Sequence, residues 1–150
     1  MSAVIDRRAE AFKEPIYFVF RVTVGLLFMQ HGAQKLFGLF GGVDGSGGTA
    51  PLVSMYGAAG GIEFLGGFLI VVGLLTRLVA LIMAGQMIIA QLIAHLPEGL
   101  IPIQNGGELS LLYLVTFLLL SVYGPGRYSI ERLVFNRDSF NTNTTAGDSS

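Results

Sequence analysis

Long apolar stretches alternate with short polar connections along this chain. Four of them approach the length of about 20 residues that a helix needs to cross the hydrocarbon core of a bilayer. By that criterion they cover about residues 15–38, 57–75, 78–96 and 107–123. The pattern predicts an all-α membrane protein whose domain, residues 15–133, is a four-transmembrane-helix bundle.

The connections predict where the helices begin and end. Pro15 suits a first helical position, where its missing N–H costs little. Only Thr76 and Arg77 separate the second and third stretches, and about 40 apolar residues are too long for one helix in a core of about 30 Å, so we expect a tight hairpin there. Gly124-Pro125-Gly126 ends the fourth stretch. We expect residues 1–14 to be a polar tail and residues 134–150, rich in Asn, Thr and Ser, to be a disordered tail.

Small residues at four-residue spacing predict close packing between the helices. The pattern small-xxx-small lets two backbones approach each other in a membrane. It occurs at Gly57/Gly61 in the second stretch, and at Ala80/Ala84 and Ala90/Ala94 in the third. Further small residues continue along the second stretch at Gly66, Gly67 and Gly73.

Basic residues predict the orientation of the bundle. The first and third connections, residues 39–56 and 97–106, contain no Lys or Arg. All basic residues outside the stretches lie in the N-terminal tail, the second connection and the C-terminal segment after the fourth stretch: Arg7, Arg8, Lys13, Arg77, Arg127, Arg132 and Arg137. By the positive-inside rule both termini are cytoplasmic.

Composition limits the chemistry. Charged residues make up 13% of the chain, whereas soluble domains carry about 25%, which again indicates a membrane protein surrounded by lipid. The net charge of -1 gives no reason to expect a nucleic-acid partner. The chain has no cysteine, which excludes disulfides, thiolate catalysis and a cysteine-ligated iron–sulfur cluster within it. The glycine-rich segment 41–48 is interpreted as a flexible connector, because no strand precedes it and no Lys-Ser/Thr follows it as in a phosphate-binding loop.

Polar residues inside the stretches form the candidate site. Ionisable residues within a membrane span are expensive and are functional candidates by default. A rise of about 1.5 Å per residue places His31 and Glu63 at one level, roughly 9 Å below the outer boundary, and Lys35 nearer to it. We therefore expect His31 to pair with Glu63, and Lys35 with Glu108. The candidate substrate or proton site lies in the outer half of the bundle and consists of His31, Gln34, Lys35, Glu63, Gln91, His95 and Glu108.

Each candidate also has a structural interpretation. A His31–Glu63 bond could fix helix register, Lys35 could mark the interface, and Gln91 could bridge helices. His95 could be solvated. Glu108 lies in the first turn of its helix, where the positive end of the helix dipole could stabilise its carboxylate. Arg21 and Arg77 are assigned structural and topological roles: we expect Arg21 to reach cytoplasmic headgroups, or to bond to Gln86 or the end of the fourth helix. No metal site and no catalytic residue are assigned.

Three motifs resemble those of the DoxX family. The first is Arg21, Gly25, Phe28, His31, Gly32 and Lys35-Leu36-Phe37-Gly38. The second runs from Glu63 through Gly66-Gly67 and Val72-Gly73-Leu74-Leu75 to Thr76-Arg77. The third combines Gly107-Glu108, Leu112, Gly124-Pro125-Gly126 and Ser129. The resemblance extends over residues 16–133 and implies a four-helix protein of a bacterial or archaeal plasma membrane, the inner membrane where a cell has two.

The resemblance also implies a function. The founding DoxX protein is the small subunit of a thiosulfate:quinone oxidoreductase, so we expect an integral membrane subunit of a quinone-linked redox complex. Whether it is itself an enzyme or acts only with a redox partner subunit stays open. One alternative is a non-catalytic assembly or anchoring subunit of a larger membrane complex, and another is a small proton-coupled transporter or channel. Quinone is the expected small molecule. Haem is not expected, because the two histidines lie about 4 Å apart in level.

Overall fold

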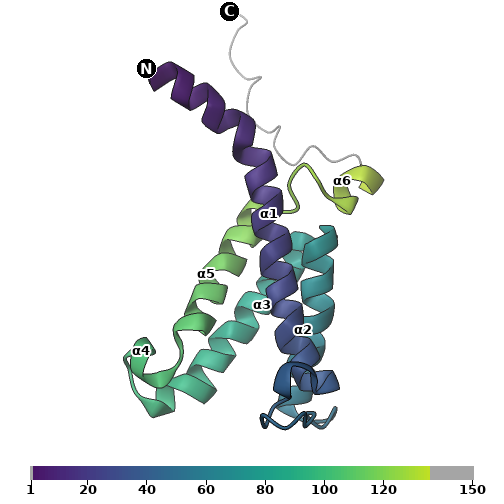
Figure 1. Cartoon of the computed structure of the whole chain (residues 1–150), viewed down its shortest axis with the longest axis vertical. Helices are drawn as coiled ribbons and strands as arrows, with labels where there is room; N and C mark the ends of the chain where they lie inside the picture. The colour runs from purple at the N-terminus through teal and green to yellow at the C-terminus, as the bar shows by residue number, and fades with distance from the viewer. Residues whose placement is uncertain (1, 136–150) are drawn as a thin grey trace, which may run out of the picture.

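The computed structural model describes residues 2–135, and that part of the chain is helical without a named strand (Figure 1). Its long helices are α1 (Ser2–Phe37), α2 (Met55–Val72), α3 (Thr76–Ala90) and α5 (Glu108–Tyr123). Three apolar segments, Glu10–Phe37, Met55–Val72 and Thr76–Glu98, are long enough to cross a membrane. α5 is apolar but shorter, with 16 residues. The all-α membrane fold predicted from the sequence is confirmed.

Short helical segments complete the described chain. They are η1 (Leu39–Gly41), the π-helical η2 (Gln91–His95), η3 (Leu96–Glu98), α4 (Pro102–Asn105) and α6 (Ile130–Phe135). Residues 38–54 and 96–107 lie together at one end of the bundle, called the loop end below (Figure 1). Residues 10–17, 73–77 and 123–135 lie at the opposite end, called the terminal end.

The first helix begins earlier than the sequence predicts. α1 starts at Ser2, so Pro15 lies inside the helix and residues 2–14 continue it beyond the bundle (Figure 1). These residues are mostly good helix formers such as Ala, Glu, Arg and Lys, which tolerate the one hydrogen bond that proline removes. At the other end of the chain α6 ends at Phe135, and the rest of the predicted disordered tail lies outside the described residues.

The hairpin between α2 and α3 turns before Thr76 rather than at Thr76-Arg77. Gly73 (φ 70°) and Leu75 (φ 51°) both adopt the left-handed conformation that ends one helix and redirects the chain. Thr76 is then the first residue of α3, and it is fully buried.

Glycine brings α1 and α2 together, at the predicted Gly67 and at other positions that the sequence analysis did not single out. A Cβ at Gly32 would lie 2.4 Å from the backbone nitrogen of Phe64, and one at Gly25 would lie 2.8 Å from the carbonyl oxygen of Gly67. Gly61, in contrast, has open space where its Cβ would be. The prediction of close packing is therefore confirmed at Gly67 but wrong for the pair Gly57/Gly61, since Gly57 packs against the loop at Pro51 and Gly61 against nothing. Small residues lie on several faces of α2, and spacing alone does not choose the face.

The second helix contact lies between α3 and α5, and α2 packs on α3 to join the two pairs (Figure 1). The predicted small pair Ala80/Ala84 is buried in the core beside Met83. Ala94 of the other predicted pair is exposed. The outward faces of the long helices are apolar, with exposed residues such as Leu26, Leu65, Leu81 and Leu119. Exposed apolar surface of this extent is expected for a protein surrounded by lipid.

Arg21 is buried, with 1% of its surface exposed, and does not reach headgroups or Gln86. Its guanidinium donates to the carbonyl oxygens of Ile70, of Val71 at 2.8 Å, and of Tyr128 at 2.5 Å. The last carbonyls of a helix lack partners within it and carry negative partial charge, so the end of α2 attracts the guanidinium. Its Nε is buried without a hydrogen-bond partner among the described residues. The contact also fastens the segment after α5 to α1 and α2.

The glycine-rich segment, interpreted from the sequence as a flexible connector, forms a hydrogen-bonded loop. Oδ1 of Asp44 accepts the backbone N–H groups of Ser46 at 2.9 Å and Gly48 at 2.8 Å. These bonds favour the charged carboxylate and lower the pKa of Asp44 to about 2. The backbone of Val43 also donates to the carbonyl of Gly48, which closes the loop.

Candidate functional site

Glu63 is the centre of a buried network with Lys35 and Gln86. The residue is 3% exposed, and its carboxylate oxygens accept bonds from Nζ of Lys35 at 2.7 and 2.5 Å. Nε2 of Gln86 donates to the same carboxylate at 2.8 Å. Since a buried charge is tolerated only when it is paired and hydrogen-bonded, the three side chains form one unit, called the Lys35–Glu63–Gln86 network.

Three helices supply this network, and a glycine lets them meet. Lys35 lies in the last turn of α1, Glu63 in the middle of α2 and Gln86 in α3. A Cβ at Gly60 would lie 2.9 Å from Cβ of Lys35. Gly60 shares the helix face of Glu63 three residues later, so its missing side chain leaves room for Lys35 above the carboxylate.

The pairs expected from depth are wrong. The structure pairs Glu63 with Lys35 and Gln86 rather than with His31, and Glu108 is exposed at the start of α5. Lys35 lies one helical turn further along α1 than His31, and its long side chain reaches back over that distance to Glu63. A carboxylate also attracts an ammonium group more strongly than an imidazole that can be neutral. Lys35 therefore points into the bundle instead of out to the interface.

His31 lies one helical turn before Lys35, in a group of aromatic side chains. Its ring is 5.9 Å from that of Tyr113, edge to face, and 6.4 Å from that of Phe28. Phe28 also contacts Tyr113 and Phe117, with ring centroids 5.0 and 4.7 Å apart. α1 and α5 thus meet in an apolar, aromatic wall next to the charged network.

Gln91 and His95 belong to a separate set of contacts at the loop end. Oε1 of Gln91 accepts a bond from Ser110 at 2.5 Å, as the interhelical role proposed for it requires. Nδ1 of His95 lies 3.0 Å from the carbonyl oxygen of Asn105, so His95 has a protein partner and is not only solvated. Asn105 in turn bonds to the backbone of Gly99 and Gly107. These contacts fasten the π-helical turn η2 to the start of α5.

The seven predicted residues therefore divide into groups. Lys35 and Glu63 bond directly, His31 neighbours them on α1, and Gln91 and His95 form loop contacts. Gln34 is half-buried, and its side chain makes no hydrogen bond within residues 2–135. The sequence analysis missed Gln86 and Tyr113 as site residues. Gln86 could have been found from the rule that a buried carboxylate needs more than one donor, whereas nothing in the sequence marks Tyr113.

One polar atom of the network has no partner. Oε1 of Gln86 is buried and accepts no hydrogen bond in the part of the chain that the structure describes. A buried acceptor without a donor costs free energy of about 1–3 kcal/mol. The network therefore offers an unused acceptor next to a fixed cation and a fixed anion. Within residues 2–135, no group of three or more His, Asp or Glu side chains could hold a metal ion.

The DoxX family model matches residues 16–96, which is more than half of the chain. The chain belongs to the DoxX family. The matched segment contains the whole Lys35–Glu63–Gln86 network and His31, whereas α5 with Tyr113 lies outside it.

Several bacterial relatives share most of this DoxX chain. An uncharacterised protein of Haemophilus influenzae is 33% identical, covering 82% of this chain and 94% of its own length. The inner membrane protein YqjF of Escherichia coli is 34% identical, covering 77% and 89%. A Bacillus subtilis protein named "Putative oxidoreductase CatD" is 32% identical, covering 77% and 84%. No solved structure matches the chain.

Proposed function

We propose that this DoxX protein is an integral membrane subunit of a quinone-linked redox complex in a bacterial plasma membrane. The quinone head group would contact His31 and the Lys35–Glu63–Gln86 network. The observation that carries the proposal is the network itself: a cation, an anion and an unused amide acceptor buried together beside an aromatic wall. The relative named "Putative oxidoreductase CatD" supports a redox role.

The chemistry of the site fits a quinone. Reduction of a quinone to a quinol takes up two electrons and two protons, one proton at each carbonyl oxygen. Lys35 and His31 can donate hydrogen bonds to a carbonyl, and Oε1 of Gln86 can accept one from a quinol hydroxyl. The flat ring would lie against Phe28 and Tyr113. The partner subunit supplies the electrons, since this chain has no cysteine to hold an iron–sulfur cluster.

Native mass spectrometry of the protein, extracted gently with its own lipids, tests this proposal. We expect the wild type to retain a quinone, and His31→Ala and Gln86→Leu to retain at least tenfold less. Gln91→Leu is the matched control, because it removes an amide that lies outside the network, in the loop contacts. Circular dichroism of each variant verifies the helical fold. A protein that retains no quinone, or three variants that retain it equally, would contradict the proposal.

A second candidate is an assembly or anchoring subunit. Its support is that the Lys35–Glu63–Gln86 network connects three helices and that the apolar outer surface is extensive. The two functions differ in what His31→Ala does to the native complex. The variant leaves the complex intact on blue native gels if the site binds quinone, and disrupts it if the site only organises the bundle for assembly.

A further inference from the structure

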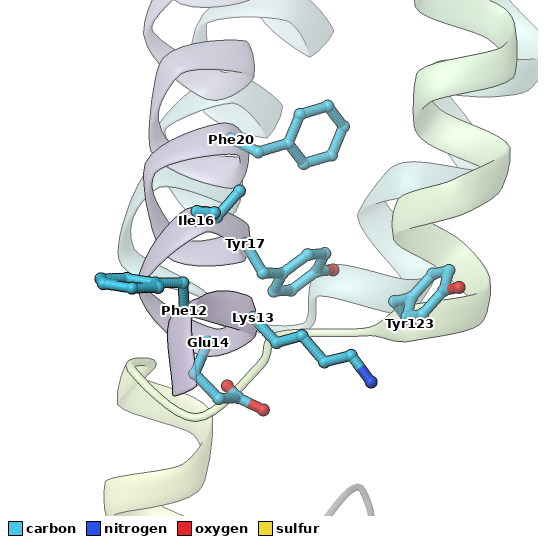
Figure 2. Close-up of a pocket in the computed structure, with 7 residues that line it drawn as sticks. All are labelled: Phe12, Lys13, Glu14, Ile16, Tyr17, Phe20 and Tyr123. Carbon is cyan, nitrogen blue, oxygen red and sulfur yellow. The ribbon is translucent and has the colours of Figure 1, made fainter. Parts of the chain in front are cut away.

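A groove lies at the terminal end, where α1 continues past the last turn of α5 (Figure 2). It has a volume of about 660 Å³. In Figure 2 Lys13, Tyr17 and Phe20 extend from α1 toward the end of α5, where Tyr123 is located. The full lining is Phe12, Lys13, Glu14, Ile16, Tyr17, Phe20 and Tyr123. The walls are thus apolar or aromatic, and the charged groups are confined to two side chains.

The mixture of charged, tyrosine and apolar residues in the groove is typical of the boundary between the hydrocarbon and the headgroups. The first membrane-crossing segment begins at Glu10, and α5 ends at Tyr123. The rings of Tyr17 and Tyr123 are tilted against each other with centroids 6.0 Å apart, and the hydroxyl of Tyr17 donates to the carbonyl oxygen of Gly124 at 2.5 Å. Tyrosine is enriched at membrane–water interfaces, where the ring is in the apolar layer and the hydroxyl is near water. Ile16 and Phe20 then face acyl chains, while Lys13 faces headgroups.

The charges around the groove favour an anion. The carboxylate of Glu14 accepts the backbone N–H of Arg127 at 3.0 Å, and that of Glu131 accepts the N–H of Thr76 at 3.4 Å. The basic side chains at this end have weaker partners than the carboxylates. Lys13 pairs with Glu10, but both side chains are exposed, at 65% and 66%, and such a pair is weak.

Two arginines at the same end add positive charge. Arg77 is exposed and makes one long bond, 3.4 Å, to the carbonyl oxygen of Ser121. The side chain of Arg127 is exposed and makes no hydrogen bond or ion pair with any other residue from 2 to 135. Basic residues at a membrane surface attract anionic lipids, and basic pockets between transmembrane helices bind their headgroups.

We propose that this groove binds one anionic phospholipid of the adjoining leaflet. Its phosphate contacts Lys13, and one acyl chain lies along Ile16 and Phe20 toward Tyr123. The shape supports a lipid, because the groove is open at the side and runs along α1 from the charged Lys13 and Glu14 to the apolar Ile16 and Phe20 (Figure 2). The site lies at the opposite end of the bundle from the Lys35–Glu63–Gln86 network, so it does not depend on the quinone proposal.

Lipid retention from vesicles of defined composition tests the groove. The full chain is reconstituted into equimolar phosphatidylglycerol and phosphatidylcholine, released, and weighed by native mass spectrometry. We expect the wild type to retain phosphatidylglycerol in preference, and Lys13→Gln to reduce that preference about fivefold, the factor for one basic residue at an anionic surface. Lys13→Arg should keep the preference, and Ile16→Ser should lower retention of both lipids.

The matched control is Leu65→Ser, an exposed apolar residue of α2 away from the groove, which should change nothing. All these positions are exposed, so the substitutions leave the core intact. Equal retention of the two lipids by the wild type would overturn the proposal, as would an unchanged preference in Lys13→Gln. Retention of a quinone that Ile16→Ser abolishes would also overturn it, because the groove would then hold a different occupant.

Discussion

The carboxylate of Glu63 is buried among three helices, and its two partners contribute differently. Lys35 neutralises its charge, and Gln86 adds a neutral hydrogen bond. Removing one member of a buried ion pair leaves the other charge without compensation, which costs more than the intact pair contributes. Measurements of unfolding free energy on variants of these residues therefore distinguish two quantities. One is the cost of burying the Glu63 carboxylate without its cation, and the other is the stabilisation that the intact Lys35–Glu63 pair provides.

Lys35→Met should lower the free energy of unfolding by about 3 kcal/mol, because it leaves the Glu63 carboxylate buried with only Gln86. The double variant Lys35→Met/Glu63→Gln should recover most of that loss, since a neutral amide at position 63 can still bond to Gln86. Reversible unfolding in mixed micelles measures both values. A single variant as stable as the wild type would mean that water reaches Glu63.

The carboxylate of Asp44 should make the stability of the loop 41–48 depend on pH, without affecting the rest of the fold. Its pKa in the folded protein, about 2, lies below the ordinary value of 3.8, so the folded loop favours the charged form. The charged carboxylate therefore stabilises the loop fully above pH 3.8, and this contribution is lost as the pH falls toward 2.

Hydrogen exchange of the Ser46 and Gly48 amides measures that contribution. Corrected for intrinsic rates, their protection should stay constant from pH 7 to pH 5 and fall between pH 3.8 and pH 2. Asp44→Asn should have lower protection of both amides already at pH 7, while Ser54, which caps α2, keeps its own bond to Gly57. Equal protection in the variant would show that the backbone bonds alone hold the loop.

At the level of elements, the sequence predicted the helices but only some of the residues by which they pack, such as Gly67, Ala80 and Ala84. Hydrophobic length determined the four long helices, since each has few alternatives in a bilayer. α2 carries small residues on several faces, and only the contact with α1 shows that Gly60 and Gly67 are the ones that touch it. The same uncertainty of rotation explains why depth alone paired His31 with Glu63.

Gly32→Ala and Gly61→Ala test this packing as a matched pair. A Cβ at Gly32 would lie 2.4 Å from backbone of α2, which cannot move aside as a side chain can. We expect the variant to separate α1 from α2 and to cost about 3 kcal/mol or more. Gly61→Ala meets open space and should be neutral or stabilising by up to about 1 kcal/mol, because alanine favours a helix.

Thermal unfolding in the same detergent compares the two variants. The helix separation in Gly32→Ala should also weaken the Lys35–Glu63 contact, since Lys35 lies three residues further along α1. Adding Lys35→Met to Gly32→Ala should then cost less than it does in the wild type. Equal destabilisation by the two alanines would show that the close approach of α1 and α2 does not matter for stability.

At the scale of the whole molecule, the family and the membrane fold followed from the sequence, while the division of the candidate site did not. Polar residues at similar predicted levels formed two sets of contacts, because α1 packs with α2 and α3 with α5 (Figure 1). His95 and Gln91 therefore make contacts at the loop end. Gln86 bonds to Glu63 rather than to Arg21, the partner considered from the sequence. Level in the membrane is a property of one helix, whereas contact depends on how two helices face each other.

The orientation of the bundle is the remaining prediction at this scale, and the absence of cysteine makes it directly testable. The basic residues near the terminal end predict that this end is cytoplasmic. In intact cells, a maleimide that does not cross the membrane should label Asp44→Cys and leave Glu10→Cys unlabelled until the membrane is opened. Both positions are exposed, so access differs only by side.

This orientation determines the chemistry open to each site. With the terminal end inside, the lipid groove opens to the cytoplasmic leaflet, and the Lys35–Glu63–Gln86 network exchanges protons nearer the outer surface. Oxidation of quinol at the network would then release protons outward, whereas reduction of quinone would take them up from outside. The reverse labelling pattern would contradict the orientation and exchange both assignments, since the two sites lie at opposite ends of one bundle.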